Sequence, residues 1–175
     1  MVNSVLFIGD SLTEWFLLDR YFPGVQIRNE GIAGDTTFGL LERIEEIPLQ
    51  NCDRIFLMIG INDIFNGFEK EDILENLELI IENLQTYASG AALHVQSILP
   101  VNISMIEYAS GLNESIRMIN SSLKEYCEDR HTSYLDLHAA FMNGSEMDRQ
   151  YTTDGAHLSK KGYDLWAEKI KAFLE

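Results

Sequence analysis

Short apolar runs alternate along the chain with longer segments whose apolar residues recur at helical spacing. The first and third runs, SVLFIG at 4–9 and RIFLMIG at 54–60, are apolar at successive positions, which is typical of parallel strands buried on both faces. Further runs predict strands at 25–31, 92–100 and 133–138. Helical periodicity predicts helices at 37–47, 70–88 and 113–129, and a last one from an N-cap at Ser159 to about 174.

This alternation of strands and helices determines the expected fold class. Parallel neighbours need right-handed crossovers, and the crossing helices then cover both faces of the sheet. The chain has no repeat, low-complexity tract or linker-like segment. We therefore expect residues 1–175 to form a single doubly wound α/β domain around a five-stranded parallel sheet.

The composition agrees with one domain and narrows the range of partners. A length of 175 residues with 46% hydrophobic content suffices for one well-filled core and is short for two. The formal net charge of −15 repels phosphate backbones, so we expect no nucleic-acid partner. No stretch is long and apolar enough for a membrane span, and the N-terminal segment lacks the basic start of a signal peptide, so we expect a cytoplasmic location.

The two cysteines, Cys52 and Cys127, lie far apart in the sequence and no histidine flanks them. They show no zinc-binding pattern, and we expect neither a metal nor an organic cofactor. We expect both to be reduced thiols, with one disulfide between them as the alternative.

Unusual polar residues follow the predicted strands. Ser11 comes after the first strand, NEGIAGDT (29–36) ends the second, and GIND (60–63) ends the third. A fourth polar segment, DGAH (154–157), precedes the last helix. Ligands of open parallel sheets bind beyond the carboxyl ends of the strands. We therefore expect the four segments to converge on one edge of the sheet.

These residues can perform nucleophilic chemistry. A serine hydroxyl needs a base that takes its proton as it attacks. His157 has an acid three residues before it, and Gly155 allows a turn in which Asp154 accepts a hydrogen bond from one imidazole nitrogen. That contact would orient His157 as the base for Ser11. The plainer reading is that Asp10 and Ser11 only cap a helix, and we give Asp10 that structural role.

The remaining site residues complete the predicted chemistry. The oxyanion donors are expected to be the Gly34 amide, the Asn62 side chain and the amide of Ser11 itself. Possible substrate-pocket residues are Phe65, Phe68 and Met105. The apolar segment 101–111 is either a substrate flap or a contact of a possible homodimer. His138, at the end of the fifth predicted strand, could border the site.

The same residues carry a family resemblance. FIGDSL, NEGIAGDT, GIND and DGAH resemble, in this order, the four sequence blocks of the GDSL esterases, also called SGNH hydrolases. GIAGDTT is similar to the platelet-activating-factor acetylhydrolase-like members. The resemblance, from residue 5 to about 172, implies a flavodoxin-like three-layer α/β/α sandwich. It also implies the nucleophile, oxyanion, acid and base roles for Ser11, Gly34 and Asn62, Asp154, and His157.

Together these features predict a serine esterase that hydrolyses small-molecule carboxylic esters with acetyl or short acyl groups through an acyl-enzyme. Within that class a carbohydrate O-acetylesterase, a lysophospholipase and a thioesterase stay open. The alternative from another class is a non-catalytic flavodoxin-like domain that binds an anion at the helix after Gly9, which the net charge of −15 disfavours.

Overall fold

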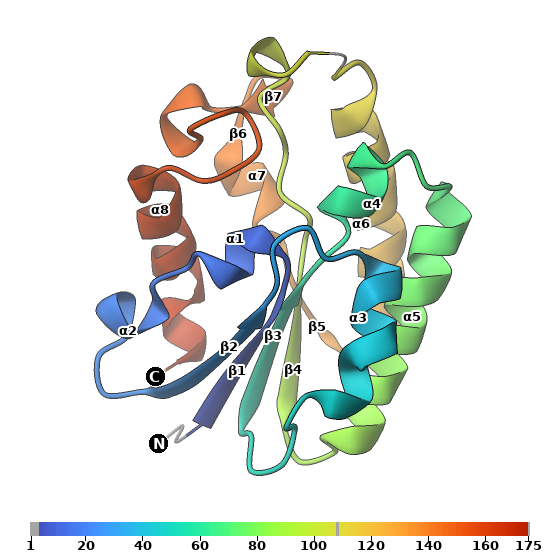
Figure 1. The fold of residues 1–175 in the computed structure, drawn as a ribbon, viewed down its shortest axis with the longest axis vertical. Helices are drawn as coiled ribbons and strands as arrows, with labels where there is room; N and C mark the ends of the chain where they lie inside the picture. The colour runs from blue at the N-terminus through green and yellow to red at the C-terminus, as the bar shows by residue number, and fades with distance from the viewer. Residues whose placement is uncertain (1–3, 108, 175) are drawn as a thin grey trace.

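The central element is a parallel five-stranded sheet with the strand order β2-β1-β3-β4-β5 (Figure 1). The computed structural model describes residues 4–107 and 109–174. The strands are β1 Ser4–Gly9, β2 Gln26–Gly31, β3 Arg54–Met58, β4 Ala92–Gln96 and β5 Ser133–Leu135. All five predicted strands are confirmed, but β3, β4 and β5 end two to four residues earlier than predicted, because the chain leaves the sheet there for the loops and helices above it.

The four long helices that the periodicity predicts are present. They are α3 Thr37–Arg43, α5 Lys70–Tyr87, α6 Leu112–Asp129 and α8 Lys160–Ile170. Ser159 caps α8 as predicted, since its side chain accepts a hydrogen bond from the Gly162 amide. Two of these helices continue into 3₁₀ turns, η1 Ile44–Glu46 after α3 and η4 Lys171–Phe173 after α8.

The helix expected after Gly9 is present as the single turn α1 Ser11–Glu14, capped by Asp10. Several other short elements were not predicted. They are helices α2 Leu18–Tyr21, α4 Ile61–Phe65 and α7 His138–Phe141, the 3₁₀ turns η2 Ile103–Met105 and η3 Arg149–Tyr151, and the hairpin strands β6 Met142–Asn143 and β7 Glu146–Met147. One turn of helix is too short to show a hydrophobic period, so no pattern marked them.

The sheet has a separate apolar core on each face. Leu6 and Ile8 of β1 point to one face, where they meet apolar side chains of α3, α5 and α6. Val5 and Phe7 point to the other face, where they meet α1, α7 and α8. Because successive strand residues alternate between faces, β1 must be apolar at each position from Val5 to Ile8 to serve both cores. The result is the predicted three-layer α/β/α arrangement (Figure 1).

Two glycines let α1 lie directly on the ends of β1 and β2. A Cβ at Gly9 would collide with the Met58 carbonyl and the Thr13 hydroxyl, and a Cβ at Gly31 would collide with the Glu14 backbone. Asn29 also donates from its side-chain amide to the Thr13 carbonyl at 2.7 Å. These contacts fix the position of α1 relative to the carboxyl ends of β1 and β2.

The two cysteines and His94 are buried among packed side chains. Cys52 and Cys127 are both buried free thiols, so the disulfide alternative does not hold. Burial raises the pKa of the Cys127 thiol to about 11, with a smaller contribution from Glu128. His94 is buried and its Nδ1 lies 3.0 Å from the Ser133 hydroxyl. Neither thiol is placed for chemistry.

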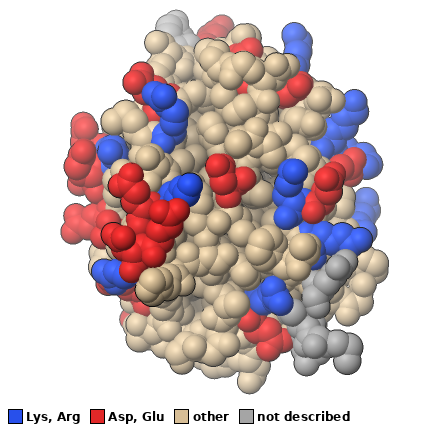
Figure 2. Space-filling view, turned by 180° about the vertical axis from the view of Figure 1, so that it is seen from behind, with Lys and Arg blue, Asp and Glu red and all other residues tan. Residues whose placement is uncertain are grey.

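The charged groups are unevenly distributed over the surface. Figure 2 shows Asp and Glu side chains crowded on one side of the rear face, while Lys and Arg gather on the other side. On α5 several acidic side chains are exposed, among them Glu71, Glu75 and Glu78. Among the residues that the structure describes, no helix has the length and apolar character of a membrane span.

Candidate functional site

A pocket of about 350 Å³ opens at the carboxyl edge of the sheet, where the polar segments were predicted to converge. Its walls come from α1, from α4, from the segment around η2 and from the loop before α8. The lining residues are Ser11, Leu12, Ile61, Asn62, Phe65, Met105, Ile106, Asp154, Ala156 and His157. Six of these ten are predicted site residues, and they come from four separate parts of the sequence: Ser11, Asn62, Phe65, Met105, Asp154 and His157.

Ser11 is the first residue of α1 and lines the pocket. Asp10 caps this helix, because its side chain accepts a hydrogen bond from the Leu12 amide at 3.0 Å. Asp10 is therefore the capping residue, and Ser11, the next residue, lines the pocket. Burial raises the pKa of Asp10 to about 7, although the Leu12 hydrogen bond acts in the opposite direction.

Asp154 and His157 form the predicted local turn. The ring nitrogen Nδ1 of His157 lies 2.7 Å from Asp154 Oδ2, and Asp154 Oδ1 accepts hydrogen bonds from the amides of Ala156 and His157. Gly155 has a φ of +102°, a conformation that suits glycine. A Cβ there would also press against Ile106. The turn thus depends on a glycine at this position.

These contacts determine which way the imidazole faces. Burial raises the pKa of the Asp154 carboxyl, but hydrogen bonds from the His157 ring and from the two amides outweigh it, so the pKa is lowered overall. An ionised carboxylate only accepts hydrogen bonds, so Nδ1 is the donor and Nε2 is the ring nitrogen left to accept a proton. His157 is one-third exposed and lines the same pocket as Ser11.

Gly34 lies in the turn after β2, in a conformation with a φ of +80°. The amides on either side of it are already used, that of Ala33 by Glu14 Oε2 and that of Asp35 by the Ile32 carbonyl. Within residues 4–107 and 109–174, the Gly34 amide has no such acceptor. It is therefore free to donate to a ligand, although Gly34 is not among the residues that line the pocket.

Asn62 lies in α4 and is held by the same turn. Its side-chain Nδ2 donates to the Asp35 carbonyl at 2.8 Å, which uses one of its two N–H groups. The neighbouring Asp63 is fully buried and accepts hydrogen bonds from the Thr37 amide and hydroxyl. Asp63 thus ties α4 to α3, which is a structural role.

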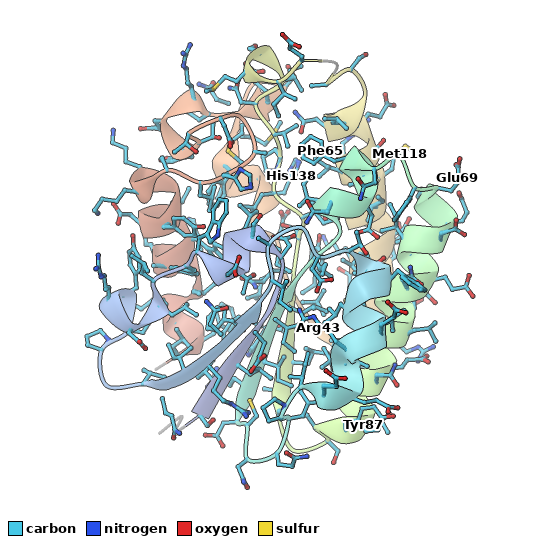
Figure 3. The ribbon with its side chains drawn as sticks, in the orientation of Figure 1. Arg43, Phe65, Glu69, Tyr87, Met118 and His138 are labelled. Carbon is cyan, nitrogen blue, oxygen red and sulfur yellow. The ribbon has the colours of Figure 1, made fainter. Side chains whose placement is uncertain are left out.

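Arg43 is a supporting residue that the sequence analysis did not identify. From α3 it pairs with Asp35 at 2.8 Å and donates to the Glu30 carbonyl at the end of β2 (Figure 3). It therefore joins the turn after β2 to the sheet edge. Nothing in the sequence distinguishes this arginine from a solvent-exposed helical arginine, because its partners are known only from the folded turn.

The pocket walls agree only in part with the predicted substrate pocket. Phe65 and Met105 line the pocket, whereas Phe68 does not and is 48% exposed. Phe68 lies beyond the end of α4 at Phe65, after Gly67 with a φ of +74°, so its role in a substrate pocket stays a prediction. The prediction that His138 could border the site is also not supported, because His138 begins α7 and lines a separate hollow with Arg117 and Tyr134.

The segment 101–111 forms one wall of the site over its described residues. Met105 and Ile106 face the pocket. The Asn102 amide donates to the Gly155 carbonyl at 2.8 Å, and the Asn102 side chain donates to the Met147 carbonyl. These bonds join the segment to the Asp154–His157 turn and to the β6–β7 hairpin. Position 108 lies outside the described residues.

The described lining of the pocket offers no cation to a phosphate and no cluster of side chains to a metal ion. None of the described residues that line it is Lys or Arg. In the described part of the chain, no three His, Cys, Asp or Glu side chains are grouped as metal ligands would be. A neutral ligand with an apolar portion suits these walls better than an anion does.

Known proteins resemble this chain at low sequence identity. A solved structure from Streptococcus pneumoniae, described as a platelet activating factor, is 32% identical and superposes with a TM-score of 0.90 over 100% of this chain and 85% of that one. The acetylxylan esterase of Geobacillus stearothermophilus is 25% identical over 79% of this chain and 78% of its own length. The N-acylneuraminate cytidylyltransferase of Streptococcus agalactiae is 23% identical over 98% of this chain, which spans only 39% of that protein.

The family assignment rests on a match along almost the whole chain. The model of the GDSL-like Lipase/Acylhydrolase family matches residues 7–165, a range that begins within β1 and ends within α8. It therefore includes Ser11, Asn62, Asp154 and His157. The chain belongs to the GDSL-like lipase/acylhydrolase family.

Proposed function

We propose that the protein is a carboxylic ester hydrolase that uses Ser11 as its nucleophile, His157 as its base and Asp154 to orient that base. The observation that carries the proposal is the 2.7 Å contact between His157 Nδ1 and Asp154 Oδ2 beside the pocket that Ser11 and His157 share. Membership of an acylhydrolase family supports the same activity. No metal or organic cofactor takes part in the proposed reaction.

The reaction proceeds in two steps. Ser11 Oγ attacks the ester carbonyl carbon while its proton moves to His157 Nε2, and the resulting imidazolium is stabilised by Asp154. The tetrahedral intermediate then breaks its bond to the alcohol oxygen, which takes the proton from His157, and leaves an acyl-enzyme. Water next attacks the acyl carbon and gives a proton to His157, which returns that proton to Ser11 as the carboxylic acid departs.

The developing oxyanion is held by three donors in this proposal: the amides of Ser11 and Gly34 and the side chain of Asn62. The free Gly34 amide and the second N–H of Asn62 support this assignment. Donors fixed before the reaction stabilise negative charge without having to reorganise. The hydrogen bond from Asn62 to the Asp35 carbonyl supplies that fixation.

Replacing Asn62 with Ala should lower kcat by about 10²- to 10³-fold and change KM little, because the lost hydrogen bond forms mainly in the transition state. Steady-state hydrolysis of p-nitrophenyl esters measures both constants. Asn66→Ala is the matched control, since Asn66 lies one turn further along at the C-cap of α4. A rise in KM with unchanged kcat would instead assign Asn62 to substrate binding.

The substrate class follows from the apolar walls of the pocket. Leu12, Ile61, Phe65, Met105 and Ile106 offer surface to an aliphatic acyl group, and no described lining residue offers a cation to an anionic one. We propose short-chain acyl esters as substrates. A carbohydrate O-acetyl ester is the second candidate substrate, because one relative of the chain is an acetylxylan esterase. The cytidylyltransferase relatives are longer proteins, of which this chain spans 39%, so their name does not identify a substrate for this chain.

Hydrolysis of p-nitrophenyl acetate, butyrate and octanoate tests both the activity and the acyl group. Each buried CH₂ contributes about 0.8 kcal/mol, so kcat/KM should rise by about tenfold from acetate to butyrate if the acyl chain enters the pocket. Turnover of acetate with equal or lower turnover of butyrate would instead favour a deacetylase. Absence of turnover, with no labelling of Ser11 by a fluorophosphonate, would favour the non-catalytic binding domain.

A further inference from the structure

Trp15 lies against the imidazole of His157. The centroids of the two rings are 4.6 Å apart and the ring planes are inclined by 37°. Trp15 is 48% exposed and belongs to neither of the two core clusters. Among the described residues, the His157 ring is therefore the aromatic ring against which the Trp15 indole packs, outside both cores.

Trp15 also belongs to the same helical turn as the nucleophile. Its amide donates to the Ser11 carbonyl at 3.0 Å, at the end of the one-turn helix α1. Residues four positions apart in a helical turn lie on the same side of it. One turn of chain therefore presents both Ser11 and a flat surface for His157, whose loop reaches α1 from the far end of the sequence (Figure 1).

We propose that Trp15 is a positioning residue for His157: its indole supports one face of the imidazole and keeps Nε2 directed at Ser11. The proposal rests on the proposed function of this site. The single hydrogen bond from Nδ1 to Asp154 leaves the ring free to tilt about that bond, and contact on its face restricts this motion. The indole face also attracts the imidazolium that forms as the proton leaves Ser11.

The charged groups around the imidazole do not duplicate this role. Asp154 contacts the edge of the ring at Nδ1. Asp10 acts on His157 only through its charge, since its carboxylate contacts the Leu12 amide. Neither group touches the face of the ring on which Trp15 lies.

Kinetics of Trp15→Ala and Trp15→Phe test the proposal. We expect kcat for p-nitrophenyl butyrate to fall by roughly threefold to tenfold in Trp15→Ala with KM nearly unchanged, and most of this loss to be restored in Trp15→Phe, which keeps an aromatic face. Leu17→Ala is the matched control: Leu17 is 54% exposed, lies two residues further along and should be replaceable without loss of kcat. Thermal unfolding should give similar Tm values for all variants.

Three results would overturn the proposal. They are unchanged kcat in Trp15→Ala, a rise of KM alone, which would make Trp15 a substrate-binding residue, and equal losses in Trp15→Ala and Trp15→Phe. The proton NMR signals of the His157 ring provide a readout that does not depend on turnover, because the indole ring current should shift them upfield and Trp15→Ala should remove the shift. A wild type that hydrolyses esters and is inactivated by Ser11→Ala separates failure of this proposal from failure of the proposed function.

Discussion

Replacing Ser11 with Ala should lower kcat/KM for ester hydrolysis by roughly 10⁵-fold or more, the scale of loss when a triad nucleophile is removed. The reason is that, among the described residues that line the pocket with His157, Ser11 is the one that carries a hydroxyl. Stopped-assay hydrolysis of p-nitrophenyl butyrate measures the loss. A fluorophosphonate should label the wild type at Ser11, as located by mass spectrometry of the peptides, and should leave Ser11→Ala unlabelled.

Ser115→Ala is the control for this experiment, because Ser115 is exposed on α6 and its replacement removes a hydroxyl of the same kind. It should keep wild-type kcat/KM. Full activity of Ser11→Ala would contradict the serine mechanism. Activity of that variant together with loss in His157→Ala would point instead to a water molecule activated directly by His157.

Replacing Asp154 with Asn should lower kcat by roughly 10³- to 10⁴-fold, near the effect of the same change in a buried serine-protease triad. The side-chain oxygen of Asn can still accept from the amides of Ala156 and His157, so the turn itself should persist. Its NH₂ group would then face Nδ1, which would have to become an acceptor. Nε2 would carry the proton and could no longer take one from Ser11.

Steady-state kinetics and thermal unfolding of Asp154→Asn check this argument together. We expect KM and Tm close to those of the wild type, since the change keeps the size and most hydrogen bonds of a half-exposed side chain. Asp129→Asn is the matched control, because Asp129 is exposed at the end of α6 and far along the chain from the site. A loss below tenfold would mean that another contact orients His157, with Trp15 as the first candidate.

The apolar strands and the amphipathic helices could be predicted because their pattern is local. β1 is apolar from Val5 to Ile8 since it serves two cores, and α5 shows its buried face in the spacing of Ile73, Leu77 and Ile80. The one-turn helices α1 and α4 have no hydrophobic period of this kind, and only the start of α1, at its cap Asp10, could be predicted. They form where the chain leaves the sheet, and their contacts lie with segments distant in sequence.

Some predictions about the whole protein stay predictions. A cytoplasmic location rests on the character of the N-terminal segment, and a homodimer rests on the apolar character of segment 101–111. Two residues of that segment, Met105 and Ile106, line the pocket, so the segment forms part of the wall of the site. Gel filtration would test the homodimer.

The sequence by itself determined the five parallel strands, the long helices, and the residue types of the site, because strand periodicity and the Asp154–Gly155–His157 turn depend on neighbours along the chain. Only the tertiary structure decided that Phe65 lines the pocket while Phe68 does not, and that Arg43 holds the turn after β2, which contains Gly34. Only the tertiary structure brought Trp15 against His157. The pocket and the contact between Trp15 and His157 join segments that are far apart along the chain, so they form only when the sheet has brought the ends of its strands together at one edge.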